Sequence, residues 1–405
     1  MKIQTKAFFH SMIILMVLKV ALLSHSTAVM AAPEVSGFIS AVGGYAMEHE
    51  TLGYEPDTMT FTNDSLLGLQ VSHDITPKLS ATGQLVARGA DNFKAEAAWA
   101  YLTYHLADSM QFRMGRFRTP FFLYSDYLDV GYAQHWISAP DEVYALQFDS
   151  VDGMDITYKR SFGRLDSKIQ VYAGSSQDDF RLNHQDVTFD IRLREQMGII
   201  GTLNYGWLTA RASFHQATRL SIDNFSELSL PAPLNNIAGL RNAVMALDAH
   251  NNLGDNGEFL LDHLDVQDVA AEFTELALRM QWAHFFILGE GTLLTFDGSP
   301  LAKQRRHLVS TGIHLHKATF FLTYARANDA PVDLAPSLSG VPDTQDLRNV
   351  LHQLTHALSL ESETTTFGMR YDLEAGVALK IEVADNKVWQ NDRSNLVRFG
   401  FHLVF

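Results

Sequence analysis

Sixteen segments in which apolar and polar side chains alternate constrain the fold of this chain more than any other feature. Strict alternation marks a β-strand whose two faces meet different surroundings. Segments of about ten residues with this pattern, separated by turn residues, are typical of transmembrane β-barrels. The sixteen segments are 35–47, 64–74, 78–88, 94–106, 108–117, 150–162, 165–175, 196–205, 206–217, 269–282, 284–296, 305–316, 317–327, 362–372, 375–385 and 395–405.

The connections between these segments alternate between short and long along the chain. Seven are tight turns, at 74–77, 106–108, 163–164, 205–206, 283–284, 316–317 and 373–374. Eight are generally longer: 48–63, 89–93, 118–149, 176–195, 218–268, 297–304, 328–361 and 386–394. Outer-membrane barrels have this asymmetry, with tight turns on the periplasmic rim and longer loops outside. We therefore predict an all-β fold, a closed antiparallel transmembrane barrel of about 16 strands.

The two faces of each strand indicate which solvent each one meets. In 375–385, Ile381 and Val383 share one side, whereas Lys380 and Glu382 share the other. Lipid outside and a water-filled lumen inside satisfy both faces. The last segment, NLVRFGFHLVF, places Phe399, Phe401 and Leu403 toward lipid, and its pairing with the first strand would remove both open sheet edges.

The first 31 residues are predicted to be a secretory signal peptide rather than part of the barrel. Lys2 and Lys6 precede the apolar run FFHSMIILMVLKVALL, and small residues follow up to a cleavage site after Ala31. A membrane helix is the alternative, and Lys19 argues against it. Residues 32–405 would then form one barrel domain without cysteines, and the loss of three lysines would change the net charge from −15 to −18. Such an acidic chain is a poor candidate for binding nucleic acid.

The terminal aromatic after alternating apolar residues resembles the C-terminal signature of bacterial outer-membrane proteins. This resemblance implies that the barrel-insertion machinery reads Phe401 and Phe405. Sixteen strands resemble the general porins, and the segment MGRFRTPFFLYSDYLDVGYAQHWISAPDEVY resembles a stretch of porin-like proteins of gammaproteobacteria. The resemblance implies an outer-membrane location, contact with its lipid, a possible homotrimer, no cofactor, and a long third loop, 118–149, folded into the lumen.

Charged residues on the lumen face and in this loop are the candidate pore-lining and constriction residues. They are Arg113, Arg116, Arg118, Asp126, Asp129, Asp141, Glu142, Lys159, Arg279, Arg370, Lys380 and Arg398. If the loop folds inward, its carboxylates would face a basic wall across a narrow gap, as in charged pore constrictions. The excess of cations on the wall predicts a mild preference for anions. The alternative is that these are ordinary solvated lumen charges.

Aromatic residues near the strand ends are predicted to form interfacial girdles, with a sugar-stacking surface in the lumen as the alternative: Trp99, Tyr101, Tyr104, Phe112, Tyr158, Trp282, Phe285, Phe286, Phe320 and Tyr324. The loop aromatics are predicted to pack against the wall rather than to contact a ligand. The three- and four-residue spacing of apolar residues predicts amphipathic helices near 237–247 and 347–358. The oxygen-rich segment 251–258 is predicted to be a turn cluster. His352 and His356 are one turn apart but have no clear third metal ligand, so no metal site is predicted.

These features predict a porin that lets small hydrophilic solutes diffuse passively through a water-filled channel. The sequence contains no phosphate-binding glycine loop, nucleophile elbow or metalloprotease motif, so no catalytic residue and no enzyme is predicted. A channel specific for an anionic or sugar solute is the first alternative. An outer-membrane enzyme or adhesin that uses the long loops is the second.

Overall fold

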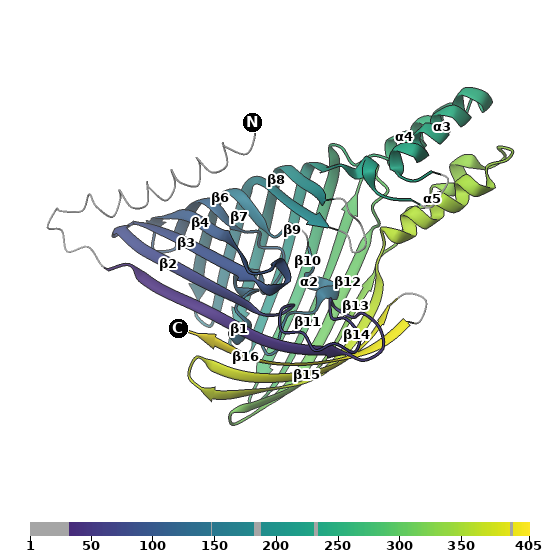
Figure 1. Cartoon of the computed structure of the whole chain (residues 1–405). Coiled ribbons are helices and arrows are strands. Elements are labelled where there is room, and N and C mark those ends of the chain that lie inside the picture. The colour runs from purple at the N-terminus through teal and green to yellow at the C-terminus, as the bar shows by residue number, and fades with distance from the viewer. Residues whose placement is uncertain (1–31, 147, 182–187, 231–233, 389–391) are drawn as a thin grey trace, which may run out of the picture.

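A computed structural model describes residues 32–146, 148–181, 188–230, 234–388 and 392–405, in which sixteen strands form one closed antiparallel barrel (Figure 1). The strands are β1 (Glu34–Ala46), β2 (Leu66–Thr76), β3 (Leu79–Arg88), β4 (Lys94–Ala107), β5 (Met110–Arg118), β6 (Ser150–Phe162), β7 (Leu165–Arg181), β8 (Thr188–Tyr205), β9 (Leu208–Asp223), β10 (Val269–Trp282), β11 (Phe285–Phe296), β12 (Gln304–Leu315), β13 (Ala318–Asn328), β14 (Glu361–Glu374), β15 (Val377–Val388) and β16 (Asp392–Val404). The predicted fold class is confirmed. The predicted signal peptide lies outside the described residues.

The first and last strands close the barrel. Phe38 of β1 is opposite Val404 of β16, and the pairing continues to Ala46 opposite Leu396. Every strand therefore has two hydrogen-bonded neighbours, and the sheet has no open edge. A bilayer core offers no hydrogen-bond partners to an open edge, so closure is what allows strands to cross it.

The predicted alternation of short and long connections is also confirmed. Seven connections have two residues each: 77–78, 108–109, 163–164, 206–207, 283–284, 316–317 and 375–376. Gly163 has a φ of +64° in one of them, the left-handed conformation that tight hairpin turns require. Successive long connections lie on the opposite rim, which we call the outer rim.

The predicted loop 176–195 is wrong over most of its length. Strand β7 continues to Arg181 and β8 begins at Thr188, so these strands extend as a hairpin beyond their neighbours at the outer rim. The segment SSQDDFR carries no apolar alternation. Its partner strand does alternate, because Phe189, Ile191 and Leu193 are buried on the inner face. The alternation in the first half of β8 was therefore overlooked, whereas the outer end of β7 offers no pattern.

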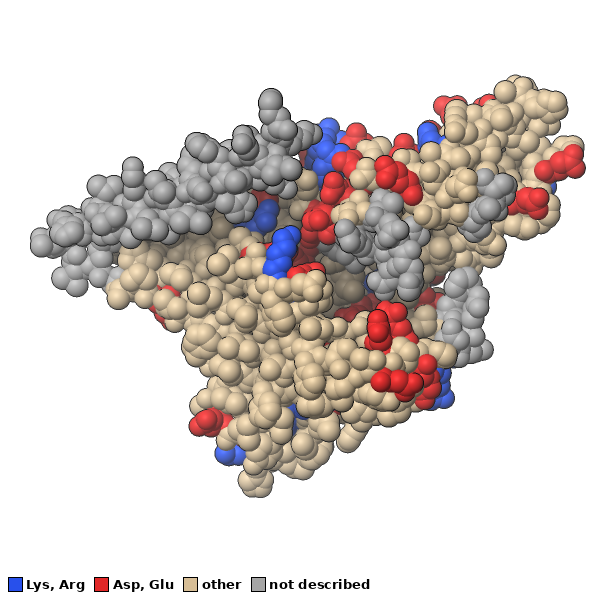
Figure 2. Space-filling view, in the orientation of Figure 1, with Lys and Arg blue, Asp and Glu red and all other residues tan. Residues whose placement is uncertain are grey.

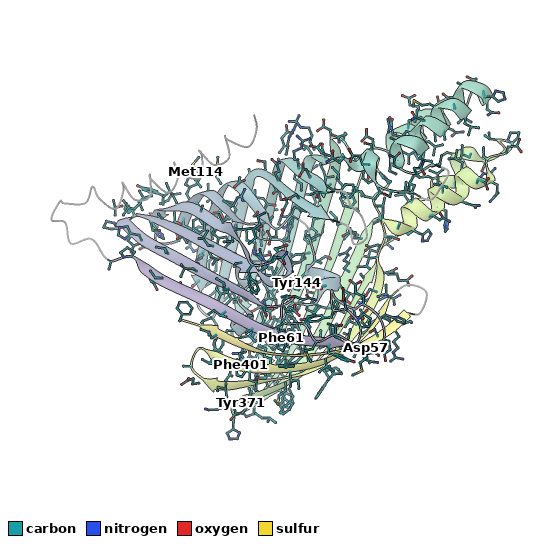
Figure 3. The ribbon with its side chains drawn as sticks, in the orientation of Figure 1. Asp57, Phe61, Met114, Tyr144, Tyr371 and Phe401 are labelled. Carbon is teal, nitrogen blue, oxygen red and sulfur yellow. The ribbon has the colours of Figure 1, made fainter. Side chains whose placement is uncertain are left out.

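The outer surface of the barrel is apolar, and on the face shown in Figure 2 it is largely uncharged. Met114, Tyr371 and Phe401 are on this surface with 55%, 38% and 53% of their area exposed (Figure 3). A girdle of exposed aromatic side chains follows the tight-turn rim: Tyr104, Phe162, Tyr205, Trp207, Trp282, Phe285, Tyr371 and Phe405. Such girdles mark the interface between lipid and water. Three residues of the predicted girdle are inside instead. Phe286 is buried, Tyr101 packs under the inward-facing Arg113, and Trp99 lies on the same face of β4 as Tyr101, opposite the buried Gln84.

Three helices stand beyond the outer rim on one side of the barrel: α3 (Ile237–Asn251), α4 (Asp255–His263) and α5 (Gln345–Ala357) (Figure 1). They enclose a small apolar core that includes Leu240, Leu260 and Leu351. Both predicted amphipathic helices are confirmed, whereas the turn cluster predicted at 251–258 is partly wrong because α4 begins at Asp255. Among the described residues, no helix is both long enough and apolar enough to cross a membrane.

Candidate pore constriction

The long connection between β5 and β6, residues 119–149, runs through the interior of the barrel, and we call it loop 3. It contains the short helices η2 (Ser125–Tyr127), η3 (Gly131–Ala133) and α2 (Asp141–Tyr144). Its partners on β15 are Lys380 and Glu382. These two side chains alternate with the exposed Ile381, so they point inward. Figure 3 places Tyr144 of this loop in the middle of the barrel.

Cationic side chains of the wall bind the main chain of loop 3. The Lys380 ammonium group, which is fully buried, donates to the carbonyl oxygen of Gly131 at 2.6 Å and to that of Trp136. Arg370 donates to the carbonyl oxygens of Gln134, at 2.8 Å, and of Tyr132. On the opposite wall Arg211 donates to the carbonyl oxygens of Phe121, at 3.1 Å, and of Pro120. These cations therefore fix the course of the loop.

Anionic side chains of the wall also hold loop 3, because they accept hydrogen bonds from its main-chain amide groups. Glu382 accepts a hydrogen bond from the amide of Ile137 at 2.6 Å and one from Arg398 at 2.7 Å. Glu290 accepts from the amide of Leu123 at 3.0 Å and from the Tyr144 hydroxyl. Arg398 also reaches Asp64 at 3.0 Å and Ser138 at 2.7 Å. Hydrogen bonds to charged groups are stronger than neutral ones, which suits a loop that must hold one course in a wet lumen.

An aromatic core joins loop 3 to the wall. Phe121 packs edge-on against Phe273 of β10, with ring centroids 4.9 Å apart. Trp136 is 1% exposed, and its indole nitrogen donates to the Thr323 hydroxyl at 2.8 Å. The apolar cluster joins six buried loop aromatics to inward-facing residues of β8 to β13: Phe121, Phe122, Tyr124, Trp136, Tyr144 and Phe148. The prediction that the loop aromatics pack against the wall concerned Phe121, Phe122, Tyr124, Tyr127, Tyr132 and Trp136. It is confirmed for the four of them in this cluster, Phe121, Phe122, Tyr124 and Trp136.

The predicted loop carboxylates have different surroundings. Asp129 lies between Arg88, at 2.9 Å, and Arg118. Burial opposes ionisation of Asp129, but the two guanidinium groups outweigh burial and hold the pKa of this carboxyl below its usual value. Glu142 is buried and accepts from the hydroxyls of Ser362, at 3.3 Å, and Thr364.

The remaining predicted charges are less tightly held. Asp126 faces Lys168 at 3.7 Å, and Asp141 is exposed. Arg113 pairs with the inward-facing Asp155 at 2.9 Å. Lys159 and Arg279 face inward, and within the described part of the chain neither has a carboxylate within 4.0 Å. Most of the predicted cationic wall is therefore neutralised, and its free charge is concentrated in a few groups.

Arg116 is not in the pore, contrary to the sequence-based prediction. It is opposite Asp152 in the β5–β6 pairing and binds this carboxylate at 2.7 Å. Met114 is two positions before Arg116 and Met154 is two positions after Asp152, so they share the face of this pair. Their side chains are 55% and 46% exposed on the lipid side. The pair therefore lies on the outer surface near the outer rim. Adjacency to loop 3 suggested a lumen position, although strand parity excludes it.

The interior contains a chamber of 280 Å³ on the tight-turn side of loop 3. One side of it is formed by residues 120 and 122–127 of the loop. The other side is formed by inward-facing side chains of β7 to β10: Lys168, Gln170, Ile200, Thr202, Asn204, Thr209, Arg211 and Arg279.

Two groups of interior residues were missed from the sequence. Glu290 could have been placed in the lumen from its alternate position in the strand FFILGEGTLLTF. Its partners in loop 3 could not be predicted from the sequence. The buried pair of Tyr172 and His215, whose hydroxyl and ring nitrogen are 2.8 Å apart, also comes from two strands whose contact the sequence did not specify. In the described residues, no group of three or more His, Asp or Glu side chains is placed to bind a metal ion.

Comparison with known proteins gives no family model and no curated protein that matches this chain. Solved structures do match. An anion-selective porin from Comamonas acidovorans superposes with a TM-score of 0.53 and 12% identity, over 92% of this chain and 99% of that one. The chain has the fold of the outer-membrane porins.

Two further structures share the porin-like fold with this chain. The outer-membrane channel DcaP of Acinetobacter baumannii superposes with a TM-score of 0.53 and 12% identity, covering 94% of this chain and 99% of that one. OmpT, an outer-membrane protein of Vibrio cholerae in a trimer form, does so with a TM-score of 0.52 and 10% identity, covering 92% and 99%. At such identities the match concerns the fold, because one fold carries many functions.

Proposed function

We propose that this protein is an outer-membrane porin, a water-filled channel through which small hydrophilic solutes diffuse passively. The observation that carries this proposal is the division of the closed barrel into an apolar outer surface and a polar interior that contains a 280 Å³ chamber. A soluble barrel would have the reverse distribution. The proposal includes that the protein is not an enzyme and uses no cofactor.

We infer the route of conduction from the sector of the barrel wall to which loop 3 is not attached. The loop is hydrogen-bonded to side chains on β9 and β11 to β16. Within the described ranges no hydrogen bond or ion pair joins residues 119–149 to β2 or β4. The inner face of this sector carries neutral polar groups such as Gln70 and Thr82. We place the conducting path here, narrowed by Arg113 with Asp155 and by Asp129 with its two arginines.

A mild preference for anions is part of the proposal. Most wall cations are consumed by ion pairs or by the main chain of loop 3 and contribute little field to the lumen. Lys159 and Lys168, which are opposite each other in the β6–β7 pairing, and Arg279 remain available. A cluster of like charges on a low-dielectric wall raises the local concentration of counter-ions.

The location and partners follow from the same surfaces. The aromatic girdle and the apolar band suit the outer-membrane bilayer. Phe401 on the last strand and Phe405 directly after it are 53% and 62% exposed, which leaves them accessible to the barrel-insertion machinery before closure. We also propose a homotrimer, which the trimer form of a structural neighbour supports at the level of fold.

Single-channel recording in planar bilayers tests the channel. The refolded protein should give stepwise conductance, and a KCl gradient should give a reversal potential of the sign for chloride preference. Replacing both Lys159 and Lys168 with glutamine should move that potential toward cation preference. Absence of steps from a folded, inserted barrel would refute the channel, whereas cation preference of the unaltered protein would refute only the selectivity.

A further inference from the structure

The chamber on the tight-turn side of loop 3 is preformed on both sides. Its volume of 280 Å³ is just below the range of about 300–1,000 Å³ typical of small-molecule sites. The wall side is built on four mutually paired strands, β7 to β10. The loop side is fixed by Arg211 at Pro120 and Phe121 and by Glu290 at Leu123. A solute would therefore meet fixed groups rather than a loop that must first be ordered, which lowers the cost of binding.

Two cations of the chamber retain unused hydrogen-bonding capacity. Arg279 donates to Gln281 at 2.9 Å and, among the described residues, has no carboxylate within 4.0 Å. A guanidinium group has five N–H donors, so most of its capacity is free. Lys168 is 3.7 Å from Asp126, and the two side chains are 34% and 54% exposed. Arg211, in contrast, is paired with Glu275 and donates to two loop carbonyls.

Neutral polar groups continue the wall between these two cations. Thr209 donates to the carbonyl oxygen of the Asn204 amide at 2.8 Å, and no acceptor among the described residues binds the amide N–H groups of Asn204. Thr202 is on the neighbouring position of β8, opposite Lys168 in the pairing. On the loop side Tyr127 is 36% exposed and is held edge-on against Tyr124, with ring centroids 5.5 Å apart. The chamber thus has a hydroxyl and amide wall that faces an aromatic ring.

The balance of donors and acceptors selects the charge of the solute. Asp126 is the one carboxylate among the described residues that line the chamber, against Lys168, Arg279 and the neutralised Arg211. An anionic group would displace the long contact between Lys168 and Asp126 at little cost, since exposed ion pairs contribute about 0–1 kcal/mol. A cationic group would have to compete with two ammonium or guanidinium neighbours.

Resting on the proposed channel function, we infer that this chamber is a binding site for small polyhydroxy carboxylates of sugar-acid size. The carboxylate binds between Lys168 and Arg279, the hydroxyl groups bind Thr202 and Asn204, and the carbon face of the solute lies on Tyr127. Such a site makes the protein a channel with affinity for one class of solute, in addition to a passive pore.

Calorimetric titration of sodium gluconate into the detergent-solubilised full chain tests the site independently of conduction. Gluconate should bind saturably, and neutral glucose should bind at least about tenfold more weakly. Lys168→Gln and Arg279→Gln should each weaken gluconate binding about tenfold. Arg164→Gln is the matched control, because this exposed arginine in the turn before β7 is outside the chamber, and it should leave the affinity unchanged. Asp126→Asn should strengthen binding, a gain that a misfolded variant would not give.

The outcomes separate the site from the channel. Stepwise conductance without saturable gluconate binding, or equal affinities for gluconate and glucose, would overturn the site and leave the channel standing. If Arg164→Gln and Lys168→Gln weakened gluconate binding equally, the effect would come from the net charge of the protein rather than from the chamber. This result would also overturn the site. Saturable binding by a barrel that conducts no ions would support the site and overturn the channel.

Discussion

Replacing Lys380 with methionine should loosen loop 3 without unfolding the barrel. Methionine keeps the length of the side chain but removes the ammonium group that binds the Gly131 and Trp136 carbonyl oxygens. The Gly131 oxygen retains a bond from the Gln134 amide at 3.2 Å, so the Trp136 oxygen is the main group left without a partner. The sixteen-strand ladder does not depend on this side chain.

The size of the effect follows from these two contacts. A buried acceptor left without its partner costs about 1–3 kcal/mol. Part of this cost is offset because Lys380→Met no longer buries an ammonium group. A net change of about 2 kcal/mol raises the population of the released loop about 30-fold, since each 1.4 kcal/mol corresponds to a factor of ten.

Single-channel recording is the assay for this change. The variant should make brief excursions to a larger conductance about 30 times more often than the unaltered protein. Lys387→Met is the matched control, because Lys387 is exposed near the outer rim and pairs with Glu363 at 3.4 Å. An excursion frequency that is the same in both variants and in the unaltered protein would refute the idea that wall cations hold the loop.

Three further predictions concern other parts of the barrel. Arg113→Gln should change the reversal potential in a KCl gradient, whereas Arg116→Gln should not, because Arg116 and Asp152 pair on the lipid side; a shift with Arg116→Gln would contradict the assigned face. The folded-state pKa of Asp129 lies below its ordinary value of 3.8, so its stabilisation of the loop is complete above that pH and is lost as the pH falls through the lower folded value. Current noise should therefore rise only below about pH 4 and should lose this dependence in Asp129→Asn; a rise near neutral pH would exclude Asp129 as its cause. Phe405→Ala should lower the yield of heat-modifiable folded barrel in outer membranes more than Phe399→Ala does, and equal yields would remove the special role of the terminal residue.

The strands and their faces could be predicted from the sequence because lipid and water impose a local pattern on every second residue. Lys380, Glu382 and Arg398 were therefore placed in the lumen correctly. The loop partners of Lys380 and Glu382 could not be predicted, because they are main-chain groups more than 200 residues away along the chain. Local pattern also failed at the outer end of β7, where SSQDDFR has no apolar alternation, and where a charge adjoins a long loop, as at Arg116. Proximity in sequence misled at Arg116, which the alternation of β5 assigns to the outer face. Arg118 has the same parity but ends the strand, and its side chain binds Asp129.

The attachment of loop 3 through its carbonyl and amide groups has a consequence for how such a protein can diverge. Every residue except proline offers the same two main-chain groups, an N–H and a C=O. The wall side chains that bind these groups therefore recognise the path of the loop backbone rather than its amino-acid sequence. Loop side chains that do not themselves contact the wall can therefore change while the path of the loop persists. Altering the permeability of this protein by directed evolution should therefore succeed sooner through substitutions on the sheet than through a rewritten loop.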